Sequence, residues 1–213
     1  GDTVTFTFTF SEVPTDFTQS DIIVNNGTLS AFTVATNNPK VYTVVFTPNA
    51  GLSGNYTNLV SVAGSSYTDG VGNPGTSASA GSLSIDTAAP TVTAVAISGV
   101  DNTNADTTNA LVAGDKVKVT VTFSEPITVT TTGGTPNFAI DVGGVIKTAS
   151  YASGSGTNTL TFTYTVTAGA NAGNLDYISQ KVAGELGYPG ALDLGNGTIK
   201  DAATGKNASL LLP

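Results

Sequence analysis

Carboxylates are the side chains in this sequence that could do chemistry, because most other reactive types are missing. The chain of 213 residues contains no Cys, Met, His or Trp, and Lys supplies all seven of its basic residues. A Ser or Cys catalytic triad in its usual form needs an imidazole, and structural zinc needs thiolate or imidazole ligands. Oxygen donors favour hard cations, above all Ca²⁺. We therefore expect no catalytic residues and no enzyme activity, with Ca²⁺ as the bound cofactor.

The elements that would position these carboxylates come in two copies. Residues 1–12, GDTVTFTFTFSE, recur as residues 114–125, GDKVKVTVTFSE, with the Gly-Asp pair, the alternation and Phe-Ser-Glu in register. Such self-similarity indicates two modules of one type, which we place at residues 1–89 and 90–213. The second copy has about two dozen residues before its Gly-Asp pair, and the first copy has none. We therefore expect the first module to lack its first strand.

Strand signals dominate both modules, and helical periodicity is almost absent. Residues 3–10 alternate perfectly, with Val4, Phe6, Phe8 and Phe10 on one face and Thr on the other, which is typical of a half-buried strand. Further strands are expected at 22–24, 28–35, 41–47, 56–63 and 79–85, and at 92–98, 116–123, 138–142, 145–152, 159–166, 198–200 and 208–212. Short strands separated by Gly, Asn and Pro predict an all-β fold of two antiparallel β-sandwiches. Residues 168–197 are the least regular and predict a short helix or a long loop.

The order of these strands should gather acidic residues at the ends of the sandwiches. The turn after the second strand and the turn before the last strand share one pole, so we expect Asp86 from the linker to converge with Glu125 and Asp201, with no Lys or Arg among them. We expect a corresponding set in the first module, which consists of Glu12, Asp16, Asp21, Asp69 and Asn73. A third set, Asp101 and Asp106, should lie at the far pole of the second module. Grouped carboxylates repel one another unless a cation bridges them, which predicts Ca²⁺. The alternative is that these residues only form turns, in which Asp and Asn are common.

Several segments resemble bacterial immunoglobulin-like repeats of large secreted adhesins, including RTX-type adhesins. The resemblance is carried by Phe-Ser-Glu after an alternating strand, by residues 66–73 (SYTDGVGN) and 86–90 (DTAAP), and in the second copy by residues 151–164 and 198–203. It covers essentially the whole chain. It implies two tandem immunoglobulin-like sandwiches, and it implies Ca²⁺ at domain junctions, which stiffens many such adhesin stalks.

Charge and resemblance together indicate a structural role outside the cell. The formal net charge is −8 and the pI is near 4.1, which argues against nucleic acid or an anionic membrane as partner. We expect calcium-stiffened spacer modules of a bacterial surface protein, secreted or at the cell surface, whose partners are neighbouring repeats of the same polypeptide. One alternative is a filament or surface-layer subunit completed by strand addition from a neighbouring chain. Another is an adhesive domain that binds a glycan or a surface, although the sequence identifies no such target.

Overall fold

The computed structural model describes residues 2–101, 103, 105–107, 110–168, 175–177 and 191–213. The chain divides into two compact units, Gly1–Ala88 and Ala89–Pro213. The sequence placed the division one residue later, after Ala89. Each unit has its own hydrophobic core.

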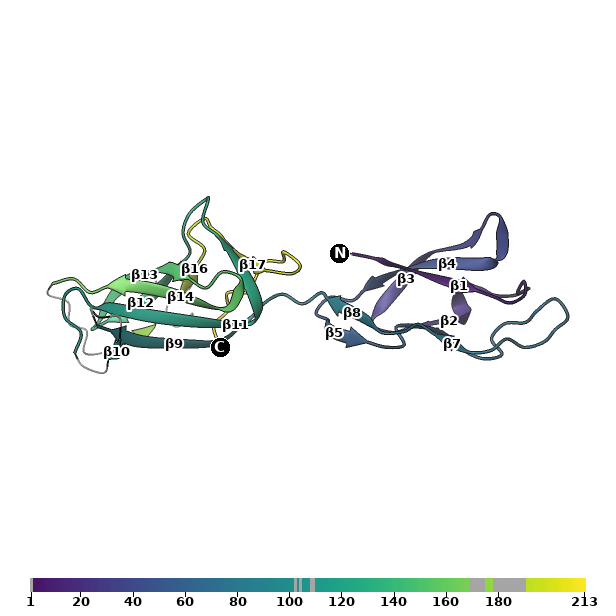
Figure 1. Cartoon of the computed structure of the whole chain (residues 1–213), viewed down its shortest axis with the longest axis horizontal. Coiled ribbons are helices and arrows are strands. Elements are labelled where there is room, and N and C mark those ends of the chain that lie inside the picture. The colour runs from purple at the N-terminus through teal and green to yellow at the C-terminus, as the bar shows by residue number, and fades with distance from the viewer. Residues whose placement is uncertain (1, 102, 104, 108–109, 169–174, 178–190) are drawn as a thin grey trace. The chain divides into compact units, whose positions relative to one another are not determined.

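The first unit consists of short antiparallel strands in separate small sheets. Figure 1 shows β1, β3 and β4 on one side of this unit and β2, β5 and β7 on the other. One sheet has the order β1-β4-β3, a second has the order β2-β6-β7, and β5 pairs with β8. The bounds are β1 Val4–Thr9, β2 Ile22–Val24, β3 Gly27–Ala35, β4 Asn38–Pro48, β5 Ser53–Tyr56, β6 Val60–Val62, β7 Ala78–Ser79 and β8 Leu83–Asp86, with one 3₁₀ turn at Gln19–Asp21.

The core of the first unit is aromatic. Phe46 from β4 is fully buried, and the Phe17 ring, which is 6% exposed, packs at 4.8 Å from Phe10 and at 5.2 Å from Tyr42. These rings meet at steep angles, the arrangement that aromatic quadrupoles favour. The alternating Phe side chains of β1 therefore face the interior, as the sequence pattern predicted.

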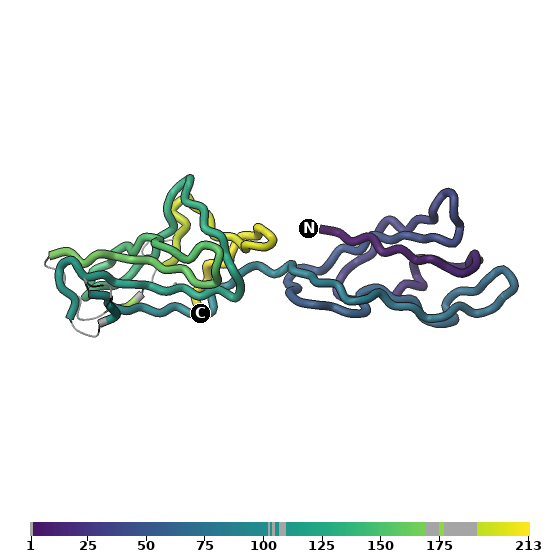
Figure 2. Tube along the Cα trace, in the orientation of Figure 1, coloured from purple at the N-terminus to yellow at the C-terminus, as the bar shows by residue number. Residues whose placement is uncertain are grey.

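The long connection between β6 and β7 folds back on itself as a hairpin (Figure 2). The Ser65 amide donates to the Gly75 carbonyl at 2.8 Å, and the Gly75 amide donates to the Tyr67 carbonyl at 2.8 Å. Gly75 is required here because a Cβ atom at this position would lie 2.1 Å from the Tyr67 ring. The hairpin therefore holds Tyr67 against the aromatic core and carries Asp69 at its tip.

The second unit is built around one long strand. Its bounds are β9 Val92–Val100, β10 Asp106–Thr107, β11 Lys116–Thr130, β12 Asn137–Val142, β13 Val145–Ser153, β14 Thr157–Thr165, β15 Leu175–Tyr177, β16 Leu192–Asp193 and β17 Thr198–Asp201. The strand order is β10-β9-β11-β14-β13-β12-β15, with β16 beside β12 and β17 beside β11. The register of β11 shifts between Thr122 and Ile127, so its first half pairs with β9 and β14 and its second half with β17. Such a bulge bends a strand and lets it serve both layers of a sandwich.

The two antiparallel immunoglobulin-like β-sandwiches are confirmed, and among the described residues of the first unit no strand corresponds to β9. In the second unit β11 lies between β9 and β14, whereas β1, its counterpart in the repeat, pairs with β4 on one side and is the edge of its sheet. The predicted strand at 208–212 is wrong, because Ser209 makes only an isolated parallel bridge to Thr91. Leu210 and Leu212 still pack against the core. Most of the irregular segment 168–197 lies outside the described residues.

Candidate functional site

Glu125 and Asp201 form a carboxylate pair in the second unit. Pairing of β11 with β17 sets Asp201 opposite Ile127, two residues from Glu125, and the Ala202 amide donates to the Pro126 carbonyl at 3.0 Å. The two side chains present carboxylate oxygens within 4.8 Å of each other. Asp201 is buried, with 3% exposed, and Glu125 is partly buried. The bulge in β11 and the start of the last turn therefore bring these two predicted residues together.

The Asp201 carboxylate is held in its ionised form by its own turn. It accepts a hydrogen bond from the Ala203 amide at 2.8 Å and another from the Thr204 hydroxyl. Burial alone would raise the pKa of Asp201, but these hydrogen bonds and the positive charge of Lys206 bring that pKa below its ordinary value. The expectation that no Lys lies near this group is therefore wrong, because Lys206 follows in the same turn.

Asp86 belongs to the first unit and is the last residue of β8. It lies opposite Ser53 of β5, and its carboxylate accepts a hydrogen bond from the Ala88 amide at 3.3 Å. Only Thr87, Ala88 and Ala89 separate Asp86 from Pro90 in the sequence. This carboxylate is thus anchored in a strand immediately before the second unit begins.

Three of the acidic residues predicted as a set in the first unit accept hydrogen bonds, two of them within local turns. Asp69 accepts hydrogen bonds from the Val71 amide at 2.9 Å and from the Asn73 amide and side chain at 2.8 Å, and the hydrogen bonds, led by that from the Asn73 side chain, lower its pKa. Asp16 accepts from the Thr68 amide at 2.7 Å, and Asp21 closes a capping box with Thr18. Among the described residues, these three and the exposed Glu12 do not form a group of three carboxylates within 4.8 Å. Asp69 and Asp21 thus take part in local turns, and the Ca²⁺ expected at this set stays a prediction.

The two acidic residues predicted at the far pole of the second unit also have separate partners. Asp101 accepts hydrogen bonds from the Thr103 hydroxyl at 2.6 Å and from the Thr103 and Ala105 amides, and these bonds lower its pKa. Asp106 forms an ion pair with Lys118 at 2.5 Å. In the part of the chain that the structure describes, no third carboxylate joins them within 4.8 Å.

Residues 1–85 match the family model of a bacterial Ig-like domain. This match spans the first unit almost entirely and supports the resemblance to bacterial Ig-like repeats. Comparison with curated proteins and with solved structures found no significant match. A bacterial Ig-like domain is a structural or surface module of a non-catalytic fold type, which agrees with the all-β architecture of the chain. Within the described residues, no helix has the length and apolar character needed to cross a membrane.

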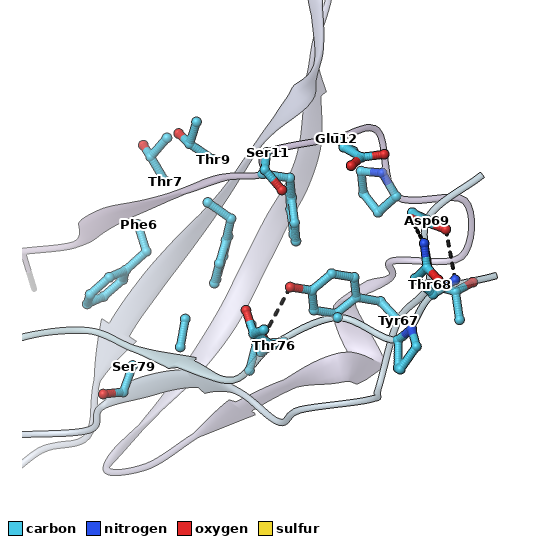
Figure 3. Close-up of a pocket in the computed structure, with 18 of the residues that line it drawn as sticks. Phe6, Thr7, Thr9, Ser11, Glu12, Tyr67, Thr68, Asp69, Thr76 and Ser79 are labelled. Atoms are coloured by element: carbon cyan, nitrogen blue, oxygen red, sulfur yellow. Dashed lines mark hydrogen bonds between the residues drawn. The ribbon is translucent and has the colours of Figure 1, made fainter. Parts of the chain in front are cut away.

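Sequence reasoning missed a groove of about 560 Å³ in the first unit. In Figure 3, Phe6 points from β1 toward the segment that carries Ser79, while Thr7 and Thr9 point away. Tyr67 lies across one end of the groove, and its hydroxyl donates to the Thr76 carbonyl at 3.1 Å. The groove runs beside β1, which pairs with β4 and with no other strand among the described residues.

Proposed function

We propose that this chain is a structural spacer of a secreted bacterial surface adhesin, in which Ca²⁺ bound by Asp86, Glu125 and Asp201 stiffens the connection between the two modules. The observation that carries the proposal is the Glu125 and Asp201 pair, whose oxygens lie within 4.8 Å although Asp201 is only 3% exposed. Removing two like charges from water is costly unless an opposite charge compensates. Lys206 contributes a positive charge beside Asp201, and a divalent cation bound by both carboxylates would add to it.

The chemistry of the pair fits Ca²⁺. Calcium binds oxygen at about 2.3 to 2.6 Å, so two oxygens on one ion lie up to about 5 Å apart. The spacing of the Glu125 and Asp201 oxygens is within that limit. When both groups are ionised they repel by roughly 3 to 4 kcal/mol at an effective dielectric constant of 20. A bound cation converts this repulsion into attraction.

Chain connectivity supports the inclusion of Asp86. Four steps along the chain join Asp86 to Pro90, and an extended chain covers at most about 3.6 Å per residue, so their Cα atoms are at most about 14 Å apart. Within the second unit, the Ser124 amide donates to the Thr91 carbonyl at 2.8 Å, which ties the residue before Glu125 to the residue after Pro90. We propose that this short tether lets Asp86 reach a cation held by Glu125, and oxygen ligands from both modules would then restrict the hinge.

The adhesin role rests on the kind of module. Residues 1–85 match a bacterial Ig-like domain, the chain repeats its module, and the net charge of −8 with no Cys suits a soluble segment outside the cell that does not rely on disulfides. These features support a spacer in a larger surface protein, whose own binding target would lie elsewhere.

Thermal unfolding of the whole chain with Ca²⁺ and with a chelator tests the metal. Ca²⁺ at a hundredfold excess over its dissociation constant should stabilise the second unit by about 2.7 kcal/mol, and Glu125→Gln should abolish that gain. With chelator, Glu125→Gln should be at least as stable as the wild type, because it removes a charge that Asp201 repels. Asp2→Asn, which removes an exposed charge outside this pair, is the matched control. A wild type that melts identically with Ca²⁺ and with chelator would refute the proposal.

A further inference from the structure

The tripeptide Asn-Gly-Thr occurs in both units, at residues 26–28 and at residues 196–198. An Asn that precedes Gly is chemically labile, because the Gly nitrogen can attack the side-chain carbonyl carbon of the Asn and a residue without Cβ does not hinder the attack. Asn26 and Asn196 are both exposed, and both have left-handed backbone, with φ of 57° and 66°. The two sites share sequence, exposure and φ, so the surroundings of the glycine that follows must distinguish them.

The amide of Gly27 points away from the strand with which its own strand pairs. Gly27 lies opposite Pro48 in the register of β3 and β4, and the Asn49 amide donates to the Asn26 carbonyl at 2.9 Å. Asn26 therefore belongs to a hydrogen-bonded pair and Gly27 to a non-hydrogen-bonded one. The sheet has the order β1-β4-β3, and no strand among the described residues pairs with the other side of β3. The Gly27 nitrogen is thus outside the ladder of hydrogen bonds.

The amide of Gly197 is engaged instead. It donates to the Leu194 carbonyl at 2.7 Å, and Gly197 is buried. A Cβ atom on Gly197 would lie 2.5 Å from the Gly134 carbonyl oxygen and 2.7 Å from the Thr130 carbonyl oxygen, so backbone encloses this residue closely. Attack by the Gly197 nitrogen would have to break its hydrogen bond and displace packed backbone. The fold therefore protects Asn196.

We propose that Asn26 is a site of spontaneous deamidation in the folded protein. The Gly27 nitrogen gives its proton to a base in the solvent and bonds to Cγ of Asn26, the bond from Cγ to the side-chain nitrogen breaks, and ammonia leaves. The cyclic imide that results adds water at either of its carbonyl carbons and opens to aspartate or to isoaspartate. No electrons are transferred. The reaction requires only water and is independent of Ca²⁺.

Isoaspartate at residue 26 alters the backbone where it supports the start of the linker. In isoaspartate the main chain runs through the former side chain, so the carbonyl that accepts the Asn49 amide becomes part of a free carboxylate. The Asn49 carbonyl accepts a hydrogen bond from the Thr87 hydroxyl at 2.6 Å, and that hydroxyl accepts another from the Leu52 amide at 2.9 Å. The modification therefore loosens a chain of hydrogen bonds that ends at the linker.

Peptide mapping by mass spectrometry, after incubation of the whole chain in mildly alkaline buffer, tests the site. In the folded chain Asn26 should deamidate at least tenfold faster than Asn196. In denaturant the two rates should be similar, because both residues lie in the same tripeptide. Equal rates in the folded chain overturn the proposal. A difference that persists in denaturant also overturns it, since that difference would come from the sequence and not from the fold.

Variants of Asn26 separate the added charge from the lengthened backbone. Asn26→Asp introduces the charge of the product without the extra main-chain atom, and Asn26→Gln removes the labile Asn. Amide exchange measured by NMR should show at least tenfold faster exchange of the Asn49 and Leu52 amides in the aged wild type. Freshly prepared Asn26→Asp, and Asn26→Gln aged in the same way, should keep the exchange rates of the fresh wild type. Unchanged exchange in an aged wild type that carries isoaspartate contradicts the effect on the linker.

Discussion

The buried and half-buried aromatic residues of the first unit should differ in how much they stabilise it. Phe46 is fully buried and packs edge-on against Phe6 at 5.9 Å, whereas Phe8 lines the open groove and is partly exposed. We expect Phe46→Ala to lower the free energy of unfolding by about 3 to 5 kcal/mol. Phe8→Ala should cost clearly less, because water already reaches part of its ring.

Denaturant unfolding of the two variants, with Thr7→Ala as the control on the outer face, measures these differences. The Thr7 side chain is exposed, so its removal should change stability by less than about 1 kcal/mol. A Phe8→Ala loss equal to that of Phe46→Ala would mean that the groove is closed in solution.

Asp201 should make the stability of the second unit depend on pH. Its pKa lies below the ordinary value, because the Thr204 and Ala203 hydrogen bonds and the Lys206 charge outweigh the effect of burial. A lowered pKa in the folded state means that the ionised group stabilises the fold above the unfolded-state pKa of about 3.9. That contribution is lost as the pH falls below about 4 and through the folded-state pKa.

Melting temperatures between pH 2 and pH 6 check this dependence. Asp201→Asn should be less stable than the wild type at pH 6, and the difference should shrink as the wild-type carboxylate becomes protonated. Asp2→Asn serves as the control, since this exposed residue lies outside the turn. A difference that stays constant down to pH 2 would show that the ionised carboxylate does not stabilise the turn.

At the scale of elements, the turn between β13 and β14 contains two glycines whose surroundings differ. Gly154 and Gly156 both have positive φ, at 111° and 88°. A Cβ atom on Gly154 would lie 2.0 Å from the Thr159 carbonyl oxygen, whereas a Cβ atom on Gly156 would meet nothing within 4 Å. Gly156→Ala should therefore cost only the left-handed backbone penalty of about 1 to 2 kcal/mol.

Gly154→Ala should cost more than Gly156→Ala, because the turn must also shift to relieve a backbone clash. Chemical unfolding of both variants measures the difference. Equal losses would indicate that the Ser153–Thr157 turn adjusts freely, and that the register of β13 and β14 does not depend on this close approach.

Alternation predicted the strands well where one face is buried, and it failed where tertiary pairing overrides local signals. Residues 3–10 were predicted as a strand because apolar and hydroxyl residues alternate there, and the strand β1 spans Val4–Thr9. The strand from Lys116 was expected to end at Phe123, since Ser124, Glu125 and Pro126 resemble a turn. It continues to Thr130 because β17 pairs with its second half, and the bulge accommodates Pro126 without a donor.

The candidate acidic residues could be predicted from the sequence, but the side chains that surround each of them could not. Asp69 and Asp201 occupy similar turns, and each accepts a hydrogen bond from the amide two residues later. Asp201 presents a carboxylate oxygen within 4.8 Å of one on Glu125, because β17 pairs with the bulged half of β11, and no corresponding long strand exists among the described residues of the first unit. That pairing is set by contacts far apart in the sequence, which spacing within a turn does not reveal.

At the scale of the whole molecule, the proposed Ca²⁺ should act on the motion between the modules as well as on their stability. The tether from Asp86 to Pro90 has three intervening residues, and a ligand on each side of it would limit the range of orientations. Asp86→Asn should leave Glu125 and Asp201 able to bind the ion more weakly. It should therefore separate stiffening from binding.

Rotational correlation times from NMR relaxation measure this separation. With Ca²⁺ the two modules of the wild type should tumble with one correlation time, and with chelator they should tumble with two shorter ones, because independent modules reorient faster than a rigid pair. Asp86→Asn should keep part of the Ca²⁺-dependent rise in melting temperature of the second unit while losing the common correlation time. Asp2→Asn should behave like the wild type in both measurements. If Asp86→Asn still tumbled as one body with Ca²⁺, Asp86 would not be the ligand that joins the modules, and the rigidity would have to come from contacts other than the cation.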